Sequence, residues 1–358
     1  MGLTDTGTAP EVLAFYRSMQ QHDVQPLWPI AETLLPASPQ PATKAWMWRW
    51  SSLLALAERA GELVPIHEGG DRRVLSLANP GLRGQPFATS TLWGAVQYLN
   101  AGEHAPAHRH TPGAIRFILQ GDGVYTTVNG DACDMHPGDL VLTPSWNWHD
   151  HNSCSDRPVV WFDGLDIPTV KALDAVFFED FPGEGLQDVE GQHNRSERLY
   201  GGPGLLAAGA AEQTHRNSPL LVYRRDDIDS TLTALLQESG GPMASLDFVD
   251  PTSGRPVMPT MGCGMHRLVP GRRTRPFRKV GSSVAVVYRG AGSSIINGQR
   301  FEWSAGDMLA IPSWAIVDHE ASEPADVFAI TDAPVLKALG LYREEFLDAP
   351  QAVTGAFP

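Results

Sequence analysis

Histidines gather in one part of this chain, and their spacing indicates metal chemistry. Six of the twelve histidines lie between residues 104 and 151, and four of them form two pairs at i, i+2. The pairs are His108 with His110 and His149 with His151. Residues two apart on a β-strand point to the same face, so each pair aims two imidazoles at one place. Imidazole suits Fe, Zn, Cu and Ni, and a third imidazole from a distant strand can close a metal site.

The segment between the two pairs predicts short strands and tight turns. Residues 115–119 and 124–128 are rich in β-branched and aromatic side chains, and Asn129-Gly130 is a strong hairpin signal. Short strands at this spacing predict an all-β barrel or sandwich. Antiparallel pairing then brings His149 back beside the first pair. Three protein ligands leave coordination positions open, which favours a catalytic site over a structural one.

The sequence around both histidine pairs resembles the motifs of the cupin superfamily. The matching residues are Gly102, His108, His110 and Gly121 in the first cupin motif, and Gly138, Pro144 and His149 in the second. Two departures matter. The metal-binding glutamate position of the family falls at Ala114 or Ile115, neither of which is a ligand, and Trp146 replaces a glycine of the second motif. The resemblance therefore implies a metal held by three histidines without a carboxylate.

Within the cupins, the sequence resembles the gentisate 1,2-dioxygenase family, which includes salicylate and 1-hydroxy-2-naphthoate dioxygenases. The matching stretches are Met47-Trp48-Arg49-Trp50, Asn79-Pro80-Gly81-Leu82-Arg83-Gly84, Arg116-Phe117-Ile118, Pro144-Ser145-Trp146 and Trp161-Phe162-Asp163-Gly164-Leu165-Asp166. This resemblance implies one Fe(II) per chain, bound by His108, His110 and His149. It further implies that the iron binds an ortho-hydroxy benzoate through its carboxylate and hydroxyl, with O2 alongside.

The leading functional expectation is an Fe(II)-dependent dioxygenase that opens gentisate between C1 and C2 with O2 to give maleylpyruvate. Salicylate, substituted salicylates and 1-hydroxy-2-naphthoate are alternative substrates, because pocket volume discriminates weakly between acids that differ by one substituent or ring. The other class is a non-catalytic cupin that binds a small acid. The intact first histidine triad weighs against that class.

Composition favours a cytoplasmic enzyme that acts on small molecules. The net charge of −14, from 27 basic and 41 acidic residues, argues against nucleic acid or anionic membrane as partners. It also means that an anionic substrate needs local positive groups. We expect reduced thiols at Cys133, Cys154 and Cys263, and the first residues have neither a basic region nor an apolar signal run. A homo-oligomer, specifically a homotetramer, is implied by the family resemblance alone.

The organisation predicted is an all-β dominated bicupin, with two tandem jelly-roll-like β-barrels and N-terminal, connecting and C-terminal helices. We expect an N-terminal helical segment over 1–70, a metal-binding barrel over 71–167 and a connector over 168–255. A degenerate barrel without metal follows over 256–332, and a C-terminal helix and tail over 333–358. Helices are expected to begin near Glu11, to span Trp46 to Ala60 and residues 228–238, and to close the chain from Pro334 to Phe346.

The second barrel repeats the turns of the first but not its histidines. Asn297-Gly298 matches Asn129-Gly130, and Pro312-Ser313-Trp314 matches Pro144-Ser145-Trp146. Carried to the ligand positions, this alignment places Phe277, Lys279 and Val317 where the first barrel has its triad. A single metal per chain is therefore predicted. His319 matches His151 and is expected to be structural.

Arginines are candidates for holding the substrate carboxylate. Arg116 lies on the strand after the first pair, within an otherwise apolar run, and a guanidinium can hold a carboxylate by two parallel hydrogen bonds. The alternative interpretation is that Arg116 is an ordinary surface arginine. Arg72 is a second candidate. On sequence alone it is equally consistent with a solvated ion pair, whereas the family resemblance places an arginine of this stretch in the pocket.

Other polar residues have predicted roles in the same pocket. Trp93 and Gln97 share one strand face and are expected to form a pocket wall that contacts substrate, although a core tryptophan with a satisfied glutamine fits nearly as well. His151 is expected to bind substrate or move a proton, since its ordinary pKa lies near neutrality. Asp163 is expected to accept a hydrogen bond from a ligand or a pocket group. We expect His104 and His136 to be exposed in turns.

Overall fold

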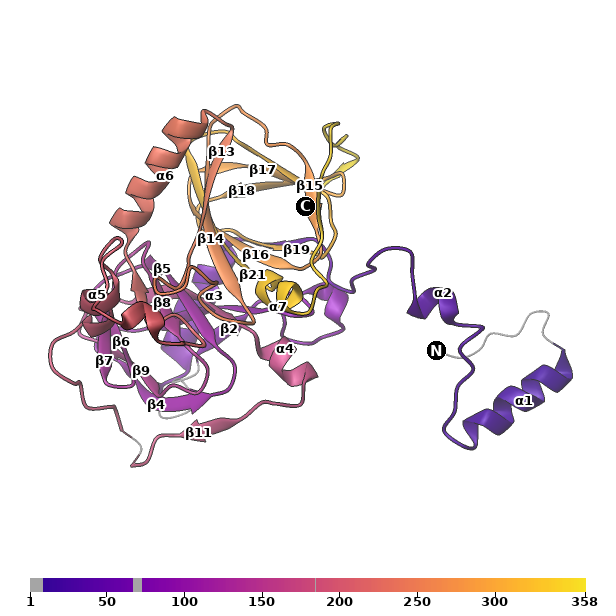
Figure 1. Ribbon diagram of the computed structural model, residues 1–358, viewed down its shortest axis with the longest axis horizontal. Coiled ribbons are helices and arrows are strands. Elements are labelled where there is room, and N and C mark those ends of the chain that lie inside the picture. The colour runs from indigo at the N-terminus through magenta and orange to yellow at the C-terminus, as the bar shows by residue number, and fades with distance from the viewer. Residues whose placement is uncertain (1–8, 67–72, 184) are drawn as a thin grey trace. The chain divides into compact units, whose positions relative to one another are not determined.

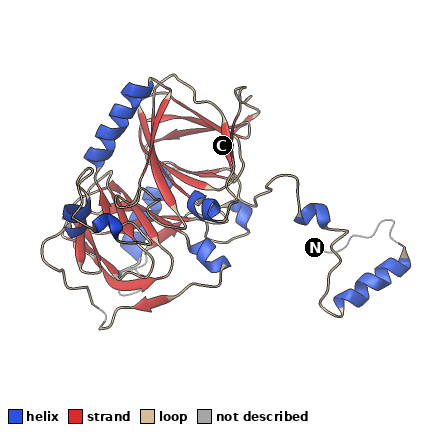
Figure 2. Ribbon diagram, viewed as in Figure 1, coloured by secondary structure: helices blue, strands red, loops and turns tan. Residues whose placement is uncertain are grey.

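The computed structural model describes residues 9–66, 73–183 and 185–358 (Figures 1 and 2). Two compact units divide the chain between Gln40 and Pro41. In the first unit, the indole of Trp28 donates a 2.8 Å hydrogen bond to the hydroxyl of Tyr16. The second unit holds both barrels. Among the described residues, no helix combines the length and the apolar character needed to cross a bilayer.

The described chain alternates many short strands with few helices. The helices are α1 (Pro10–Gln20), α2 (Ala31–Leu34), α3 (Trp50–Leu63), α4 (Ile167–Ala172), α5 (Arg195–Tyr200), α6 (Arg225–Ser239) and α7 (Ala333–Ala338), with 3-10 turns at Pro80–Leu82 and Ala210–Glu212. The strands of the first half are β1 (Trp46–Trp48), β2 (Val74–Ser76), β3 (Trp93–Leu99), β4 (His104–His110), β5 (Ala114–Gln120), β6 (Val124–Val128), β7 (Asp131–Met135), β8 (Leu140–Thr143), β9 (His149–Ser153), β10 (Val159–Leu165), β11 (Phe178–Asp180) and β12 (Val222–Tyr223). Those of the second half are β13 (Met243–Asp247), β14 (Gly262–Leu268), β15 (Phe277–Lys279), β16 (Ser283–Arg289), β17 (Ala291–Ile296), β18 (Gln299–Ser304), β19 (Met308–Ile311), β20 (Val317–Ala321), β21 (Ala325–Thr331), β22 (Glu344–Phe346) and β23 (Gly355–Ala356).

Each barrel is built from two sheets. In the first barrel, one sheet has the order β12-β8-β5-β10-β3-β2 and the other β11-β4-β9-β6-β7. In the second barrel, the orders are β1-β19-β16-β21-β14-β13 and β22-β15-β20-β17-β18-β23. The neighbouring strands run antiparallel except for β18 and β23. This arrangement confirms the predicted all-β bicupin.

The same backbone turns recur in both barrels. Asn129 and Gly130, between β6 and β7, have φ of 46° and 82°, and Asn297 and Gly298, between β17 and β18, have φ of 50° and 81°. Two successive left-handed residues form the hairpin turn whose twist matches that of the flanking strands, and Asn-Gly is its preferred sequence. The predicted internal repeat is therefore present in the backbone.

The two barrels pack against each other through one sheet of each (Figure 1). Phe117 of β5 stacks on Phe328 of β21 with ring centroids 4.4 Å apart and planes within 4°. The helix α6 adds Ile228 and Leu232 to the same buried cluster. Because the outward face of the β5 sheet is committed to this apolar interface, its inward face is left for the polar residues of the first barrel.

Two predicted helices differ from those observed. The helix expected from Trp46 begins only at Trp50, because Trp46–Trp48 forms strand β1 and pairs with β19 of the second barrel. Trp46 also packs edge-on against Phe357 at 4.9 Å. At the other end, α7 stops at Ala338, and Gly340 follows with a left-handed φ of 71°. The residues Glu344–Phe346 then form β22 instead of the predicted helix.

The domain boundaries expected near residues 70, 167, 255 and 332 stay predictions. The N-terminal segment nevertheless contains more than helices, since β1 extends a sheet of the second barrel. The connector likewise contributes strands, because β11 pairs with β4 and β12 pairs with β8 of the first barrel. Segments outside the predicted barrel ranges therefore complete both barrels.

Candidate metal centre

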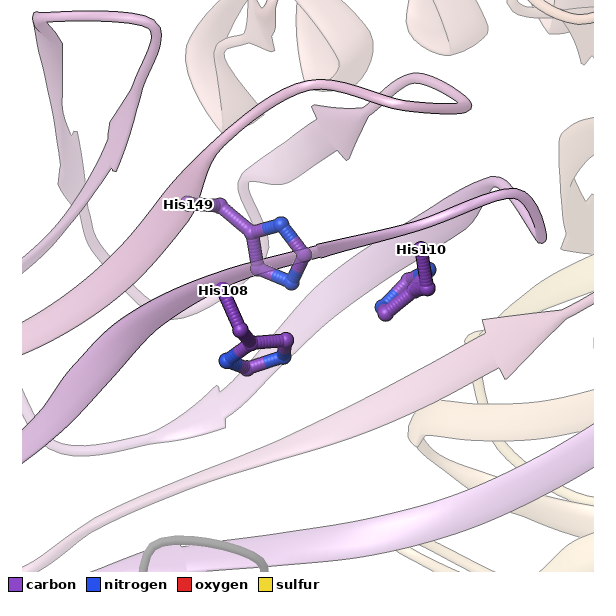
Figure 3. A group of neighbouring side chains, drawn as sticks. All are labelled: His108, His110 and His149. Carbon is purple, nitrogen blue, oxygen red and sulfur yellow. The ribbon is translucent and has the colours of Figure 1, made fainter. Parts of the chain in front are cut away.

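The three histidines predicted to bind a metal meet on one face of a single sheet. Strands β4 and β9 are antiparallel neighbours, and His108 lies directly opposite His149. His110 follows two residues later on β4 and therefore shares that face. The ring centroid of His149 lies 4.4 Å from that of His108 and 4.8 Å from that of His110. Figure 3 shows the three imidazoles grouped together.

Main-chain carbonyls orient all three rings. Each Nδ1 lies within hydrogen-bond distance of a carbonyl two residues away: His108 and Pro106 at 3.1 Å, His110 and Pro112 at 2.7 Å, and His149 and Asn147 at 3.0 Å. A carbonyl oxygen can only accept, so each Nδ1 carries a proton, and in the neutral form of the ring Nε2 then keeps its lone pair. This is the outer-shell arrangement that fixes the tautomer of metal-binding histidines.

The lone pairs of the triad suit a metal ion. The candidate ligand nitrogens lie within 4.8 Å of one another, and among the described residues no other group of three His, Cys, Asp or Glu converges in this way. The Nε2 of His149 is buried and has no hydrogen-bond partner among those residues. Burial lowers the pKa of His110 to about 4 and, helped by the charge of Arg116, holds that of His149 well below its usual value. Both rings are thus neutral, which is the form that binds metals.

Arg116 lies beside the triad, held by two neighbours on the inward face of its sheet. It is 4% exposed and sits opposite Asp163 in the register of β5 and β10. Its Nε lies 3.2 Å from Oδ1 of Asp163, and its Nη1 donates to the hydroxyl of Thr143. No partner for its Nη2 lies among the described residues. The guanidinium is therefore anchored at one end and available at the other.

Asp163 is the buried counter-charge of that arginine. Burial raises the pKa of Asp163 to about 6, although the charge of Arg116 opposes the rise. At neutral pH the carboxyl is ionised and can hold the guanidinium in place. Asp163 thus acts on Arg116 through its charge. Its Oδ1 has no hydrogen-bond partner among the described residues, so its role as an acceptor stays a prediction.

His151 lies close to the triad but outside it. It is 2% exposed, and its Nδ1 lies 2.8 Å from the hydroxyl oxygen of Thr126. Its ring centroid is 6.2 Å from that of His149 and 5.1 Å from that of Trp161. Burial holds the pKa of His151 well below its usual value. The structure therefore brings His151 to the site as a neutral imidazole.

The predicted pocket wall belongs to β3, on the same inward face. Gln97 lies opposite Trp161 of β10 and is 7% exposed. No hydrogen-bond partner for the Gln97 amide lies in the described part of the chain, so the amide is available to a bound molecule. Trp93 is half-buried and donates from its indole nitrogen to the hydroxyl of Ser76. Arg72 lies outside the described residues.

One neighbour of the triad was missed by sequence reasoning. Phe178 of β11 stacks on His108, with ring centroids 5.3 Å apart and planes within 25°. The strand is fixed by Arg109, whose Nε and Nη2 donate to Glu179 at 2.9 and 2.7 Å. The signal available in the sequence was the run Val176-Phe177-Phe178, an apolar stretch within a segment expected to be loops.

The strand pair β15 and β20 of the second barrel has the same register as the pair β4 and β9 that carries the triad. Phe277 of β15 pairs with Val317 of β20, as His108 pairs with His149. The predicted correspondence of these positions is therefore observed in the strand pairing. Neither phenylalanine nor valine can bind a metal.

A second equivalence concerns His110 and Lys279. The main-chain N–H of Trp146 donates to the carbonyl of His110 at 2.8 Å, and that of Trp314 donates to the carbonyl of Lys279 at 2.7 Å. Both tryptophans are left-handed, with φ of 63° and 64°. Lys279 thus occupies the backbone position that His110 has in the first barrel, and it places an amine where the first barrel has an imidazole.

The remaining histidines are exposed or hydrogen-bonded as expected, but His104 lies in a strand and not in the predicted turn. His104, the first residue of β4, and His136 are exposed. The Nδ1 of His136 lies 3.2 Å from Asp139. His319 occupies the place of His151, and its Nδ1 lies 2.7 Å from the hydroxyl oxygen of Ser294. It is a hydrogen-bonded histidine, as predicted.

Comparison with known proteins gives the same fold and a consistent chemistry. Residues 95–167 match the cupin domain family. The chain is similar to a gentisate 1,2-dioxygenase of Streptomyces sp., with 45% identity over 336 residues that cover 92% of this chain and 93% of the relative. It is also similar to a 5-aminosalicylate 1,2-dioxygenase of Comamonas sp., with 32% identity over 96% of this chain and 93% of the relative.

A solved structure is similar along almost the whole chain. It is the crystal structure of a salicylate 1,2-dioxygenase from Pseudoaminobacter salicylatoxidans in adducts with gentisate. The TM-score is 0.91 at 39% sequence identity, and the match covers 97% of each chain. Sequence and structure therefore point to the same group of enzymes.

Proposed function

This chain belongs to the gentisate 1,2-dioxygenase family of ring-cleaving cupin enzymes, and we propose that it opens gentisate between C1 and C2 to give maleylpyruvate. Membership makes the protein an oxidoreductase that incorporates both atoms of O2. The choice of gentisate rests on the similarity to the Streptomyces enzyme, which is 45% identical. The observation that carries the proposed chemistry is the triad, whose imidazoles converge beside the buried Nε2 of His149, an atom without a hydrogen-bond partner among the described residues.

His108, His110 and His149 are the proposed ligands of one Fe(II) per chain. The carbonyls bonded to their Nδ1 atoms direct each Nε2 lone pair into the shared space. When bound there, Fe(II) supplies a Lewis acid for the substrate's carboxylate and hydroxyl and electrons for O2. Stacking of Phe178 on His108 shields one edge of the site from water. Holding both reactants in one place lowers the entropic cost of their encounter.

Arg116 is the proposed binding partner of the substrate carboxylate. Its Nη2 is its unengaged end, while Thr143 and Asp163 hold the other nitrogens. A buried guanidinium attracts a carboxylate strongly because little water screens the pair. Arg72 is proposed as a further contact with substrate.

His151, Gln97, Trp93 and Asp163 complete the proposed substrate site. The neutral His151 ring can accept or donate a proton at Nε2, since the hydroxyl of Thr126 serves its Nδ1 in either sense. This imidazole can therefore move the proton of a substrate hydroxyl. The amide of Gln97 and the indole face of Trp93 offer polar and apolar contacts to the ring. Asp163 acts through Arg116 as a positioning residue.

Related acids are the alternative substrates. Similar proteins act on salicylate and 5-aminosalicylate, according to their names, and another similar protein from Nocardioides sp. is a 1-hydroxy-2-naphthoate dioxygenase with 32% identity. For assembly and location, we propose a homotetramer in the cytoplasm. Size-exclusion chromatography with light scattering tests that assembly.

Oxygen uptake by the Fe(II)-loaded protein tests the proposal. The panel is gentisate, salicylate, 5-aminosalicylate and 1-hydroxy-2-naphthoate, with mass analysis of products made under labelled O2. We expect the highest kcat/KM for gentisate and a ring-opened product that carries both labelled atoms. A higher kcat/KM for another acid would move the assignment to that substrate. No uptake with any of them would favour a cupin that binds an acid without cleaving it.

A further inference from the structure

The second barrel encloses a cavity that the proposed dioxygenase chemistry does not use. Its volume is about 120 Å³, and apolar side chains such as Phe277, Val317 and Val327 form most of its wall. Three side chains with nitrogen atoms also line it, those of His266, Lys279 and His319. A void in a barrel that had no function would be expected to fill with apolar side chains.

Lys279 brings a positive side chain to the wall of this cavity. No hydrogen-bond or ion-pair partner for its ammonium lies among the described residues. Three carboxylates act on its charge without pairing with it: Asp332 most strongly, then Asp247 and Glu344. The carboxylate of Asp332 accepts from the main-chain N–H of Ser282 at 2.8 Å and the hydroxyl of Thr91 at 2.5 Å. Burial lowers the pKa of Lys279, and the carboxylates of Asp332, Asp247 and Glu344 oppose that fall without reversing it. An anion bound in the cavity would supply a direct counter-charge for Lys279.

His319 adds a hydrogen-bond donor to the same wall. The hydroxyl oxygen of Ser294 accepts from the indole N–H of Trp303 at 2.9 Å and lies 2.7 Å from Nδ1 of His319. If Ser294 donates its own proton to that Nδ1, every polar atom of the chain Trp303–Ser294–His319 is satisfied. The proton of the neutral imidazole then sits on Nε2, where it can donate to a ligand.

His266 provides a second neutral imidazole, with its Nδ1 2.8 Å from the hydroxyl oxygen of Ser245. Burial lowers the pKa of His266 to about 3 and that of His319 to about 4, so neither competes with Lys279 for charge at neutral pH. Among the lining residues described, the one carboxylate is Asp247, whose side chain is exposed to solvent. Water screens that exposed negative charge more than it screens the half-buried side chain of Lys279.

We infer that the second barrel binds a small carboxylate, with the ammonium of Lys279 as its counter-ion and the Nε2–H of His319 as a donor. Lys279 thus stands in the second barrel at the position that His110, a proposed metal ligand, takes in the first. The volume of about 120 Å³ is smaller than the ~150 Å³ cavity known to admit benzene. The ligand is therefore a short aliphatic monocarboxylate, and a hydroxybenzoate is too large for this cavity. The inference is independent of the substrate proposed for the first barrel.

Equilibrium dialysis of labelled propionate against the iron-loaded enzyme tests this site. Lys279→Met removes the charge and keeps the length of the side chain. Lys171→Met is the matched control, because Lys171 is an exposed lysine outside the cavity. We expect wild type and Lys171→Met to bind one propionate per chain more than Lys279→Met does at the same propionate concentration. The affinity of Lys279→Met for that propionate should be lower by about thirtyfold or more, as when one partner of a charge pair is truncated. Any propionate held by the iron is common to all three proteins and cancels.

Two further measurements define the ligand and protect against misfolding. Propionamide, which lacks the charge, and benzoate, which exceeds the cavity, should show no difference between wild type and Lys279→Met. Ala329→Leu fills the cavity while retaining Lys279, since Ala329 lines it, and should also lose the additional propionate. Iron content and turnover report whether each variant is folded. Equal propionate binding by wild type and a folded Lys279→Met or Ala329→Leu variant would overturn the inference.

Discussion

Replacing Arg116 with alanine is expected to weaken substrate binding while leaving the metal in place. Arg116 is 4% exposed and bonds none of the triad histidines, so iron retention should not change. The change removes the one buried cation that faces the metal centre in the described structure. It also leaves Asp163 without its counter-charge, and the pKa of that carboxyl, already raised to about 6, should rise further. At neutral pH Asp163 then takes up a proton, which limits the loss of stability.

The size of the effect follows from the nitrogens that are free. Nη1 donates to Thr143, and Nε faces Asp163 at 3.2 Å without a hydrogen bond, so Nη2 is the nitrogen turned to neither residue and left for a substrate carboxylate. A hydrogen bond to a charged group contributes about 1.5–3 kcal/mol. With the added misplacement of the ring, we expect a loss of about 2–3 kcal/mol, which is roughly a 30- to 150-fold fall in kcat/KM for gentisate. Arg116→Lys should recover part of this loss, because a lysine restores the charge without the planar geometry.

The assay is steady-state oxygen uptake at equal iron occupancy, with thermal unfolding measured on the same samples. Arg267→Ala is the matched control, since Arg267 of the second barrel is another buried arginine and pairs with Asp326 at 2.8 Å. That variant should lose stability and keep its KM for gentisate. An Arg116→Ala enzyme with near-normal kcat/KM would refute the reasoning and leave Arg72 as the candidate for the carboxylate.

Two other perturbations probe the surroundings of the triad. Thr126→Val removes the hydroxyl bonded to His151 and should lower kcat by about tenfold or more without loss of iron. The equivalent change in the second barrel, Ser294→Ala, should leave turnover unchanged. Equal effects of the two changes would argue against a role for His151 in proton movement. Asp163 has a folded pKa of about 6, above its ordinary value of 3.8, so protonation favours the folded state and its contribution to stability is present below about pH 4 and lost as the pH rises through about 6. We therefore expect the difference in melting temperature between wild type and Asp163→Asn to decrease from about pH 4 to about pH 6 and to stay level at higher pH. A difference that does not change with pH would contradict the raised pKa.

Local patterns were sufficient to predict the framework of the site. The alternation of His108 and His110 on one strand and the Asn129-Gly130 hairpin signal depend on residues close in sequence, and both are observed. The internal repeat also placed Lys279 correctly, because equivalent turns fix the strand register between them. The resemblance to the gentisate 1,2-dioxygenase family is confirmed by relatives that match nearly the whole chain.

Long-range pairing was not accessible from the same patterns. Trp46–Trp48 has an aromatic composition compatible with either a helix or a strand, and its pairing with β19 more than 250 residues away selects the strand. Phe178 reaches His108 only because β11 adds to the edge of β4. The contact between Arg116 and Asp163 likewise depends on the register of β5 and β10. None of these partners is adjacent in the sequence.

Elemental analysis of the dialysed protein tests the central claim most directly. Wild type, His149→Ala and His136→Ala are loaded with Fe(II), and iron per chain is measured beside oxygen uptake with gentisate. His136 is exposed and serves as the matched histidine control. We predict one iron per chain in wild type and His136→Ala, and loss of both iron and turnover in His149→Ala. Two tightly held irons per chain, or full iron retention by His149→Ala, would contradict a single metal centre formed by the three histidines of the first barrel.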